Sequence, residues 1–494
     1  MTLGALRANA APMIDLRPVG YVIGLMVVML GLTMLAPMGV DMLDGQGHWP
    51  VFAQSAMVTT LIGAVVALSC QSGTHEGLTL QQTFILTTGV WVALPIFGAI
   101  PFVLGATEAR FVDAFFEAMS GLTTTGSTVL SGLDSLPRGL LLWRGILQWL
   151  GGIGIIVVAM VFLPELRVGG MQIFRSEGFD TMGKILPRAT QISAQISSIY
   201  IFLTVACIVV YMVFGMTFFD ALVHAFTTIS TGGFSNYDGS FGTFRGPTEY
   251  AATVFMFLSA LPFVRYVQMV NGSAKPLFHD PQVRAFLVTI VVLVVVTAIG
   301  LTTFSAKHPE ESFRQALFNI TSIISGTGYA SADYMLWGSP IIAMFFFIGL
   351  IGGCAGSTAC SVKVFRYQLL FAAIRVQIQK LHTPSGVFTP RYAGRPVGED
   401  VLSSVMVFFV FFLVTLGILA VFLAMTGLDF LTSVSGAAAA IANIGPGLGD
   451  IIGPSGNFGS LNDTAKWLLA IGMLIGRLEL LAVFVILTPQ FWRA

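Results

Sequence analysis

Residues 111–128 read FVDAFFEAMSGLTTTGST, an apolar segment about half the length of a membrane span that runs into threonines and a glycine. Three similar segments follow at residues 218–235 (FFDALVHAFTTISTGGFS), 313–330 (FRQALFNITSIISGTGYA) and 430–449 (FLTSVSGAAAAIANIGPGLG). When the four are aligned, Gly126, Gly233, Gly328 and Gly445 occupy the same position. Four related segments in one chain predict four structural repeats arranged around an axis.

Each segment has too few apolar residues to cross a bilayer, so it is suited to a helix that enters the membrane and turns back. Non-helical backbone inside a membrane persists only where it is buried in protein or lines a cavity. Four such tails around one axis would present a ring of carbonyl oxygens, which can replace the hydration shell of a bare cation. The alternative is that the small residues only allow close helix packing, but that does not explain four copies at matching places.

The candidate cation filter consists of the aligned glycine and the two residues before it in each tail. These residues are Thr124, Thr125, Gly126, Thr231, Gly232, Gly233, Gly326, Thr327, Gly328, Asn443, Ile444 and Gly445. The fourth tail departs from the others because it has no hydroxyl residue before its glycine.

The composition predicts an all-α integral membrane protein. Of 494 residues, 55% are hydrophobic and only 10% are charged, whereas soluble domains carry about 25% charged residues. The net charge of zero gives no reason to expect nucleic acid binding. The four cysteines (Cys70, Cys207, Cys354 and Cys360) fit no zinc or CxxC spacing, and we expect them to be small apolar fillers.

The apolar runs divide the chain into a hairpin and four repeats. Residues 1–72 form an N-terminal tail and an extra transmembrane hairpin, and each later unit reads outer helix, re-entrant helix, filter tail, inner helix. The units are residues 73–164 (repeat 1), 165–272 (a cytosolic loop and repeat 2), 273–380 (repeat 3) and 381–494 (repeat 4). Ten spans and four re-entrant segments are therefore expected.

Basic residues predict the orientation, because Lys and Arg accumulate in short cytoplasmic loops. The loops between units hold Arg167, Arg175, Lys184, Arg188, Lys275, Arg284, Lys363, Arg366, Arg375, Lys380, Arg391 and Arg395. The opposite side, which includes the filter tails, holds fewer: Arg138, Arg245, Lys307, Arg314 and Lys466. We expect the filter to open outward and both termini to be cytoplasmic.

A run of small and hydroxylated residues interrupts the third inner helix. It consists of Gly352, Gly353, Cys354, Ala355, Gly356, Ser357, Thr358, Ala359, Cys360 and Ser361. Several glycines together can leave the backbone unwound, so this segment is a candidate gate below the filter; close helix packing is the alternative. Lys363 and Arg366 follow at once and are expected to mark the cytoplasmic end.

Arg477 lies within the apolar fourth inner helix, where a buried arginine is costly and is a functional candidate. We expect it to face the pore or contact the gate; pairing with a neighbouring helix is the alternative. Glu479 points to another face of the helix, so a pair with Arg477 is a poor explanation. For Arg144 and Arg265, nearer the helix ends, a structural role is favoured.

These motifs resemble the membrane subunit of the Trk/Ktr/HKT potassium transporters. TTTGST, STGGFS, SGTGYAS and NIGPGLG, together with ALPFVRYVQ, GGCAGSTACSVKVFR and IGRLELLAVFVILTP, are similar to its TrkH branch, which also carries the extra hairpin. The resemblance implies potassium uptake through a homodimer with one pore per protomer in the cytoplasmic (inner) membrane. It also implies K⁺ bound by filter carbonyls, the gate at Gly352 to Ser361, and Arg477 as the pore arginine. Gly126 favours potassium, because sodium-preferring plant relatives have serine there.

The resemblance further implies a cytosolic ring of TrkA-like regulatory subunits that bind nucleotides. This sequence has no P-loop and no G-x-G-x-x-G after a predicted strand, so we expect no organic cofactor on this chain. The basic loops that begin at Leu166, Gly272 and Lys363 are the available docking surface.

Three other functions would each need particular residues. Symport of K⁺ with Na⁺ or H⁺ would need carboxylates along the path, and the candidates are Asp113, Glu117, Asp220 and Glu479. A neutral-solute channel would not need four glycine-bearing tails. An intramembrane enzyme would use Ser357 or Cys360 as nucleophile and His224 as base, but His224 belongs to the outer side, so no enzyme is expected.

Overall fold

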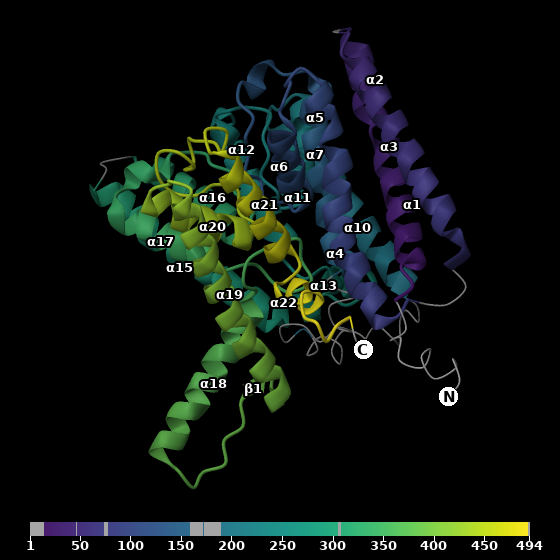
Figure 1. Ribbon diagram of the computed structural model, residues 1–494. Coiled ribbons are helices and arrows are strands. Elements are labelled where there is room, and N and C mark those ends of the chain that lie inside the picture. The colour runs from purple at the N-terminus through teal and green to yellow at the C-terminus, as the bar shows by residue number, and fades with distance from the viewer. Residues whose placement is uncertain are drawn as a thin grey trace, which may run out of the picture.

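The computed structural model describes residues 14–45, 47–73, 78–158, 171, 189–304 and 308–492. Figure 1 shows a bundle of helices, most of them upright in the view. Within these residues, seven helices are long and apolar enough to cross a membrane, or eight if one bent pair counts as a span. In the described part of the chain the only strands are β1 (Arg391–Tyr392) and β2 (Arg395–Pro396), which form an antiparallel pair. The predicted all-α membrane fold is confirmed.

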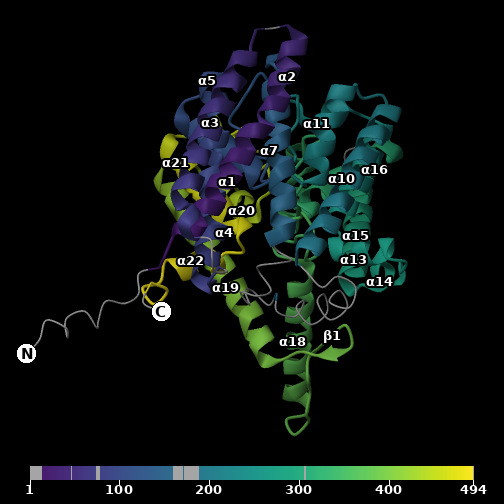
Figure 2. The same ribbon diagram turned by 90° about the vertical axis from the view of Figure 1, so that its right-hand side faces the viewer.

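The N-terminal hairpin packs through glycines and is attached to the first inner helix. It comprises α1 (Arg17–Thr33), α2 (Leu35–Asp44) and α3 (Trp49–Cys70). A Cβ on Gly24 would lie 2.6 Å from the backbone nitrogen of Ala67, so the backbones of α1 and α3 are in close contact. The buried Asp41 carboxylate accepts a hydrogen bond from the Gly139 backbone nitrogen at 2.7 Å and contacts His48 Nδ1 at 2.7 Å. Figure 1 shows this hairpin along one side of the bundle, and Figure 2 shows it in front of the other helices.

Outer helices and short helices alternate along the chain as expected. The outer helices are α4 (Leu80–Gly98, continued by α5, Ile100–Leu104), α10 (Ala189–Val213), α15 (Pro281–Phe304) and α19 (Glu399–Met425). The short helices are α6 (Phe111–Leu122), α11 (Phe218–Ile229), α16 (Pro309–Ser325) and α20 (Phe430–Ala442). A non-helical tail follows each short helix, so all four expected short helices are present.

The inner helices differ from the prediction, because three of the four are interrupted rather than one. Among the described residues, only α7 (Arg138–Val157) is continuous. The others are α12 (Pro247–Ser259) with α13 (Phe263–Val270), α17 (Ser339–Gly349) with α18 (Val364–His382), and α21 (Asp463–Arg477) with α22 (Leu481–Ile486).

Each unexpected break has a local cause. The axes of α12 and α13 differ by 90°, and Pro262 lies at the break, where its ring cannot continue the helix. Between α21 and α22, Glu479 and Leu480 have φ angles of 55° and 54°, a conformation that interrupts a right-handed helix. Residues 478–480, which form this second break, include no glycine or proline, so it could not be predicted from their composition.

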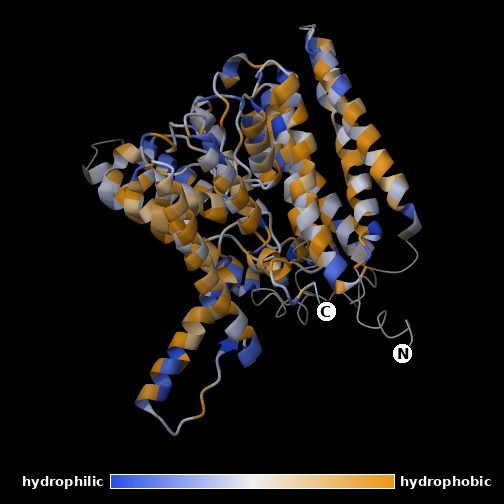
Figure 3. Cartoon of the chain, in the orientation of Figure 1, coloured by the Kyte–Doolittle hydropathy of each residue, from blue (hydrophilic) through white to orange (hydrophobic). Residues whose placement is uncertain are grey.

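One helix extends well beyond the ends of the others. Figures 1 and 2 both show α18 projecting from the bundle, with β1 and β2 in the return connection. Hydrophobic residues dominate the bundle, whereas the far end of α18 and the β hairpin are more hydrophilic (Figure 3). The short helix α14 (Lys275–His279) precedes α15. Short 3₁₀ turns connect other elements: η1 (Gln71–Gly73), η2 (Leu133–Ser135), η6 (Ser240–Thr243) and η7 (Tyr334–Trp337).

Candidate functional site

The four tails leave their helices through the same backbone conformation. The aligned residues Thr124, Thr231, Gly326 and Asn443 have φ angles of 53°, 51°, 80° and 51°. This left-handed conformation commonly ends a helix and turns the chain away from its axis. The alignment of the divergent fourth tail, made from sequence alone, is therefore matched at the level of the backbone.

The aligned glycines bring each tail against the next one, and the four contacts close a ring. A Cβ built on each glycine would meet the backbone of the following tail. The atom nearest to the added Cβ is Gly232 O at 2.1 Å for Gly126, Thr327 O at 1.9 Å for Gly233, Gly445 N at 2.7 Å for Gly328, and Gly126 O at 3.0 Å for Gly445. Only glycine fits this approach at the first three positions, where φ is also positive (87°, 76° and 81°).

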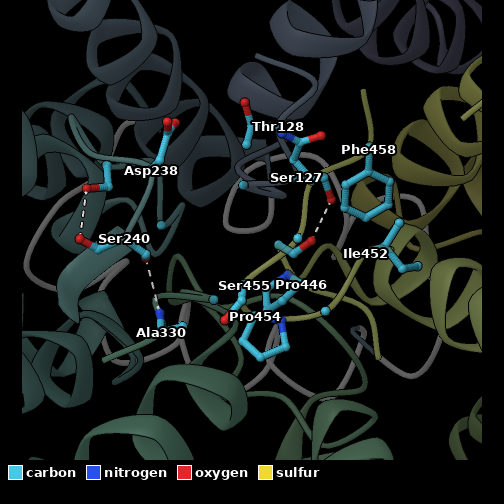
Figure 4. Close-up of a pocket in the computed structure, with 18 of the residues that line it drawn as sticks. Ser127, Thr128, Asp238, Ser240, Ala330, Pro446, Ile452, Pro454, Ser455 and Phe458 are labelled. Carbon is cyan, nitrogen blue, oxygen red and sulfur yellow. Dashed lines mark hydrogen bonds between the residues drawn. The ribbon is translucent and has the colours of Figure 1, made fainter. Parts of the chain in front are cut away.

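A cavity of about 540 Å³ reaches this ring, and all four aligned glycines line it. Most of the other lining residues come from the ends of the tails and from the loops that follow them, and Figure 4 shows Ser127, Asp238, Pro446 and Phe458 among them. Two carboxylates, Asp238 and Asp450, belong to the lining. The one basic residue of the lining, Arg144, is 1% exposed and paired with Glu117, so the cavity favours a cation.

A buried ion pair fixes the first and second tails from outside the ring. Arg144 Nε donates to Glu117 Oε1 at 2.8 Å, and Arg144 Nη1 donates to the Ser235 carbonyl oxygen at 2.6 Å. Glu117 also accepts a hydrogen bond from the Val129 backbone nitrogen at 2.9 Å. The structural role expected for Arg144 agrees with these contacts, although the residue lies within α7 rather than close to its end.

Gln148, which the sequence analysis missed, supports the second tail. Its Nε2 donates to the Gly232 carbonyl oxygen at 2.6 Å, and its Oε1 accepts from the Phe234 backbone nitrogen at 3.0 Å. A polar side chain in an otherwise apolar inner helix is the signal that could have identified it.

The small-residue segment forms non-helical backbone packed against the bend of the second inner helix. The Cys354 backbone nitrogen donates to the Ala260 oxygen at 3.0 Å, and the Phe263 nitrogen donates to the Gly356 oxygen at 2.9 Å. The Ala355 nitrogen donates to Gln282 Oε1 at 2.9 Å. Because the segment is unwound, close packing of a continuous helix does not account for it.

Arg477 contacts this segment. It is the last residue of α21, and its side chain is buried. Its Nη1 donates to Cys360 Sγ at 2.6 Å, and its Nη2 donates to the Gly151 carbonyl oxygen at 3.2 Å. Cys360 Sγ also lies 3.7 Å from Thr124 Oγ1 in the first tail. The expectation that Cys360 is only an apolar filler was therefore wrong, because its thiol joins a filter tail to Arg477.

Lys363 and Arg366, which were expected to mark the cytoplasmic end, are both buried within the protein rather than exposed in a loop. Lys363 Nζ donates to the Ala359 carbonyl oxygen within the segment. Arg366 forms an ion pair with Glu479, and its guanidinium lies 3.8 Å from the centre of the Phe408 ring. The pair joins the first turn of α18 to Glu479, which lies in the break between α21 and α22.

The groups proposed for an enzyme do not come together. His224 uses Nδ1 toward the Asp220 carbonyl oxygen at 2.8 Å and Nε2 toward Ser235 Oγ at 3.0 Å. Ser357 Oγ donates to the Cys354 carbonyl oxygen at 2.7 Å, and Cys360 contacts Arg477. No nucleophile and base are paired among these three side chains.

Arg265, also read as structural, forms an ion pair with Asp280 at 2.7 Å. Part of the predicted cytosolic surface, with Arg167, Arg175, Lys184 and Arg188, lies outside the described residues, as does Lys307.

Comparison with known proteins gives consistent matches over nearly the whole chain. A model of the TrkH family, described as cation transport protein, matches residues 48–493. The Trk system potassium uptake protein TrkI of Halomonas elongata is 42% identical over 479 residues, covering 96% of this chain and 97% of the relative. The Trk system potassium uptake protein TrkH of Escherichia coli K12 is 35% identical over 488 residues, covering 97% and 99%.

The fold is also similar to a solved structure. The crystal structure of the potassium transporter TrkH from Vibrio parahaemolyticus superposes with a TM-score of 0.89 at 34% identity, covering 97% of this chain and 100% of that one. The chain therefore belongs to the TrkH family of cation transport proteins.

Proposed function

We propose that this protein takes up potassium across the cytoplasmic membrane through the ring of four tails. The observation that carries the proposal is the closed ring, in which each aligned glycine lies against the backbone of the next tail at the floor of the cavity. K⁺ would be bound there by backbone carbonyl oxygens of the twelve filter residues named above. The names of the relatives, which are potassium uptake proteins, support the choice of ion.

The contacts of the four candidate carboxylates favour flow driven by the membrane potential over symport. The potential supplies about 2.3 kcal/mol per charge per 100 mV. Each candidate for coupling is already engaged: Asp113 with Lys466 Nζ at 2.5 Å, Glu117 with Arg144, Asp220 with Asn236 Nδ2 at 2.9 Å, and Glu479 with Arg366. A coupling carboxylate must exchange an ion or proton during transport, so these pairings favour uncoupled flow. Symport with Na⁺ or H⁺ is the alternative. It is tested by measuring whether potassium uptake by the Glu479→Gln variant still depends on the proton gradient.

The segment from Gly352 to Ser361 would be the gate. This is supported by its non-helical backbone, its contact with Arg477, and its hydrogen bonds to the bend between α12 and α13. The segment is held from two inner helices, so a movement of either could release it. Arg477 would hold the segment through Cys360 and oppose a second cation below the filter.

The projecting helix α18 is the surface we propose for a cytosolic, nucleotide-binding TrkA-like subunit. Phe371, Ile374, Ile378 and Leu381 are exposed and follow the three-and-four spacing of a helix-packing stripe. The segment after Arg366 carries Arg375, Lys380, Arg391 and Arg395 before the first acidic residue, Glu399. A partner with an apolar face and acidic rim is therefore favoured. Because Lys363 is buried, this surface begins farther along α18 than its start, and the loop from Leu166 lies outside the described residues.

We further propose the division of the chain into the hairpin (1–72) and the four repeats that end at 164, 272, 380 and 494. The alternation of outer and short helices supports it. The protein would lie in the inner membrane with its cavity open to the outside. The helix α18 and both termini would lie in the cytosol, as the basic residues indicate. Assembly as a homodimer is part of the same proposal.

The test is potassium or rubidium uptake into proteoliposomes at an imposed inside-negative potential, with and without sodium. Wild type is expected to take up potassium selectively, and Gly126→Ser to admit sodium as well. Absence of cation uptake with and without a nucleotide-binding regulatory subunit would contradict the proposal. Uptake of urea or ammonia instead of cations would indicate a neutral-solute channel.

A further inference from the structure

The four quadrants of the ring are not supported in the same way. In the first and third tails a pair of hydroxyls braces the tail from within: Thr123 Oγ1 to Thr125 Oγ1 at 2.7 Å, and Ser325 Oγ to Thr327 Oγ1 at 2.8 Å. The second and fourth tails have Gly232 and Ile444 at the position of Thr125, so they lack this brace. Gln148 supports the second tail from the neighbouring inner helix.

The fourth tail is held by the first tail. Ser127 Oγ donates a hydrogen bond to the Gly445 carbonyl oxygen at 2.7 Å, and both residues line the cavity. The residues that align with Ser127 are Phe234, Tyr329 and Pro446, so no other described tail has a serine or threonine at this place. Gly445 is also the one aligned glycine without a positive φ, so its backbone departs from the other three.

A second hydrogen bond joins the first and fourth tails through residues that precede the aligned glycines. Asn443 Nδ2 donates to Thr125 Oγ1 at 3.0 Å and to the Met473 carbonyl oxygen at 2.9 Å. The Thr123 hydroxyl donates to the Met119 carbonyl oxygen at 2.7 Å, so the hydroxyl of Thr125 donates to Thr123. This series of hydrogen bonds, from Asn443 through Thr125 to Thr123, holds the fourth tail in the ring independently of Ser127. The bond from Ser127 therefore serves to orient the Gly445 carbonyl.

We infer that Ser127 is a positioning residue for ion selectivity, which it exerts by fixing the carbonyl of Gly445 in the fourth quadrant. The inference rests on the proposed function of the ring as a cation filter. A carbonyl that accepts a hydrogen bond is held in direction and offers less of its negative charge to a cation. Without the hydroxyl, the carbonyl can tilt inward and bind more strongly. Both changes favour the smaller sodium ion, because a smaller ring of stronger ligands offsets its greater cost of dehydration.

The experiment measures the K⁺/Na⁺ permeability ratio of the full-length protein in planar bilayers or proteoliposomes, from the reversal potential under paired-ion gradients. Ser127→Ala is expected to lower the ratio by about two- to ten-fold, the range that corresponds to one hydrogen bond. Ser127→Thr keeps the hydroxyl and is expected to keep the ratio. Ser127→Cys replaces it by a weak donor and is expected to lie between wild type and alanine, which gives a second readout if the alanine variant does not fold.

Ser455→Ala is the matched control. Ser455 also lines the cavity, but its hydroxyl donates to Asp333 Oδ2 at 2.9 Å rather than to a filter carbonyl, so its loss is expected to leave the ratio unchanged. A ratio unaltered in both Ser127→Ala and Ser127→Cys would overturn the inference, as would an equal loss in Ser127→Thr. A wild type that shows no potassium selectivity would instead refute the proposed function, so the two failures are distinguishable.

Discussion

Arg477 donates from Nη1 to Cys360 Sγ at 2.6 Å and thereby joins the end of α21 to the unwound segment of the third inner helix. Cys360 in turn lies 3.7 Å from the Thr124 hydroxyl. A filter tail, the candidate gate and the fourth inner helix therefore meet through three side chains.

Replacing Arg477 by methionine is expected to raise basal potassium flux severalfold. The variant loses the hydrogen bonds to Cys360 and to the Gly151 carbonyl oxygen, and it removes a positive charge below the filter. Flux into proteoliposomes without any regulatory subunit is the measurement. The matched control is Arg284→Met, at an exposed arginine near the start of α15, which is expected to behave as wild type. Reduced flux in a well-folded Arg477→Met would count against the arginine as part of the closed gate.

Shortening the unwound segment tests the gate directly. Deletion of Ala355, Gly356 and Ser357 removes the bonds to Gln282 and to the Phe263 nitrogen, and it is expected to raise flux. Gln282→Ala removes one of these anchors and is expected to raise flux less. Unchanged flux in a deletion variant that elutes as a single species in detergent would show that the segment does not obstruct the pathway.

The four aligned glycines are expected to tolerate alanine unequally. Alanine at Gly126 or Gly233 would place Cβ about 2 Å from a backbone oxygen of the next tail and would need positive φ, which alone costs about 1–2 kcal/mol. At Gly445 the nearest atom is 3.0 Å away and φ is not positive. Thermal unfolding in detergent should rank Gly445→Ala as the mildest of the three variants. The opposite ranking would contradict the ring contacts.

The buried pair of Glu117 and Arg144 is expected to be essential for stability rather than for ion binding. Glu117→Ala leaves the buried guanidinium without its carboxylate, which typically costs about 3–5 kcal/mol. The double variant Glu117→Ala with Arg144→Ala is expected to lose less than the sum of the single losses. Thermal unfolding of all four proteins in the cycle measures this, and strict additivity would show that the two charges do not interact.

The stripe on α18 is expected to bind the regulatory subunit. Replacing Ile374 and Ile378 by asparagine should weaken binding of a nucleotide-binding ring at least tenfold by calorimetry and leave the flux of the isolated protein unchanged. Leu336→Asn, at another exposed leucine outside α18, is the control for general loss of apolar surface. Equal weakening by the control would argue against a specific contact on α18.

The short helices and the backbone of their tails could be predicted from the sequence, because four copies of one pattern could be compared with one another. The alignment places Asn443 at the same position as Thr124. Both residues have left-handed backbone, although one side chain is an amide and the other a β-branched hydroxyl. The sequence also anticipated the unwound run from Gly352, where glycines are dense. These features depend on local backbone chemistry, which a sequence records directly.

Contacts between distant segments could not be predicted in the same way. Lys363 and Arg366 follow an apolar run, as loop residues do, and only the fold shows that Glu479 neutralises Arg366. The break after α21 has no glycine or proline, and its left-handed residues are held by the surrounding packing. Gln148 lies outside the quoted motifs, and TTTGST contains Ser127 without indicating its partner, because each side chain bonds to a carbonyl group that another part of the chain brings to it.

The ring of glycine contacts has an evolutionary consequence. Each tail occupies the space that a side chain on the preceding tail would need, and the last tail is followed by the first. A change in one copy therefore has to be accepted by its neighbour, so the copies are selected jointly and drift slowly. The inner helices meet different partners, and one is continuous while three break at different places. Traces of an ancestral duplication are therefore expected to remain clearest at the ring and to fade toward α13, α18 and α22.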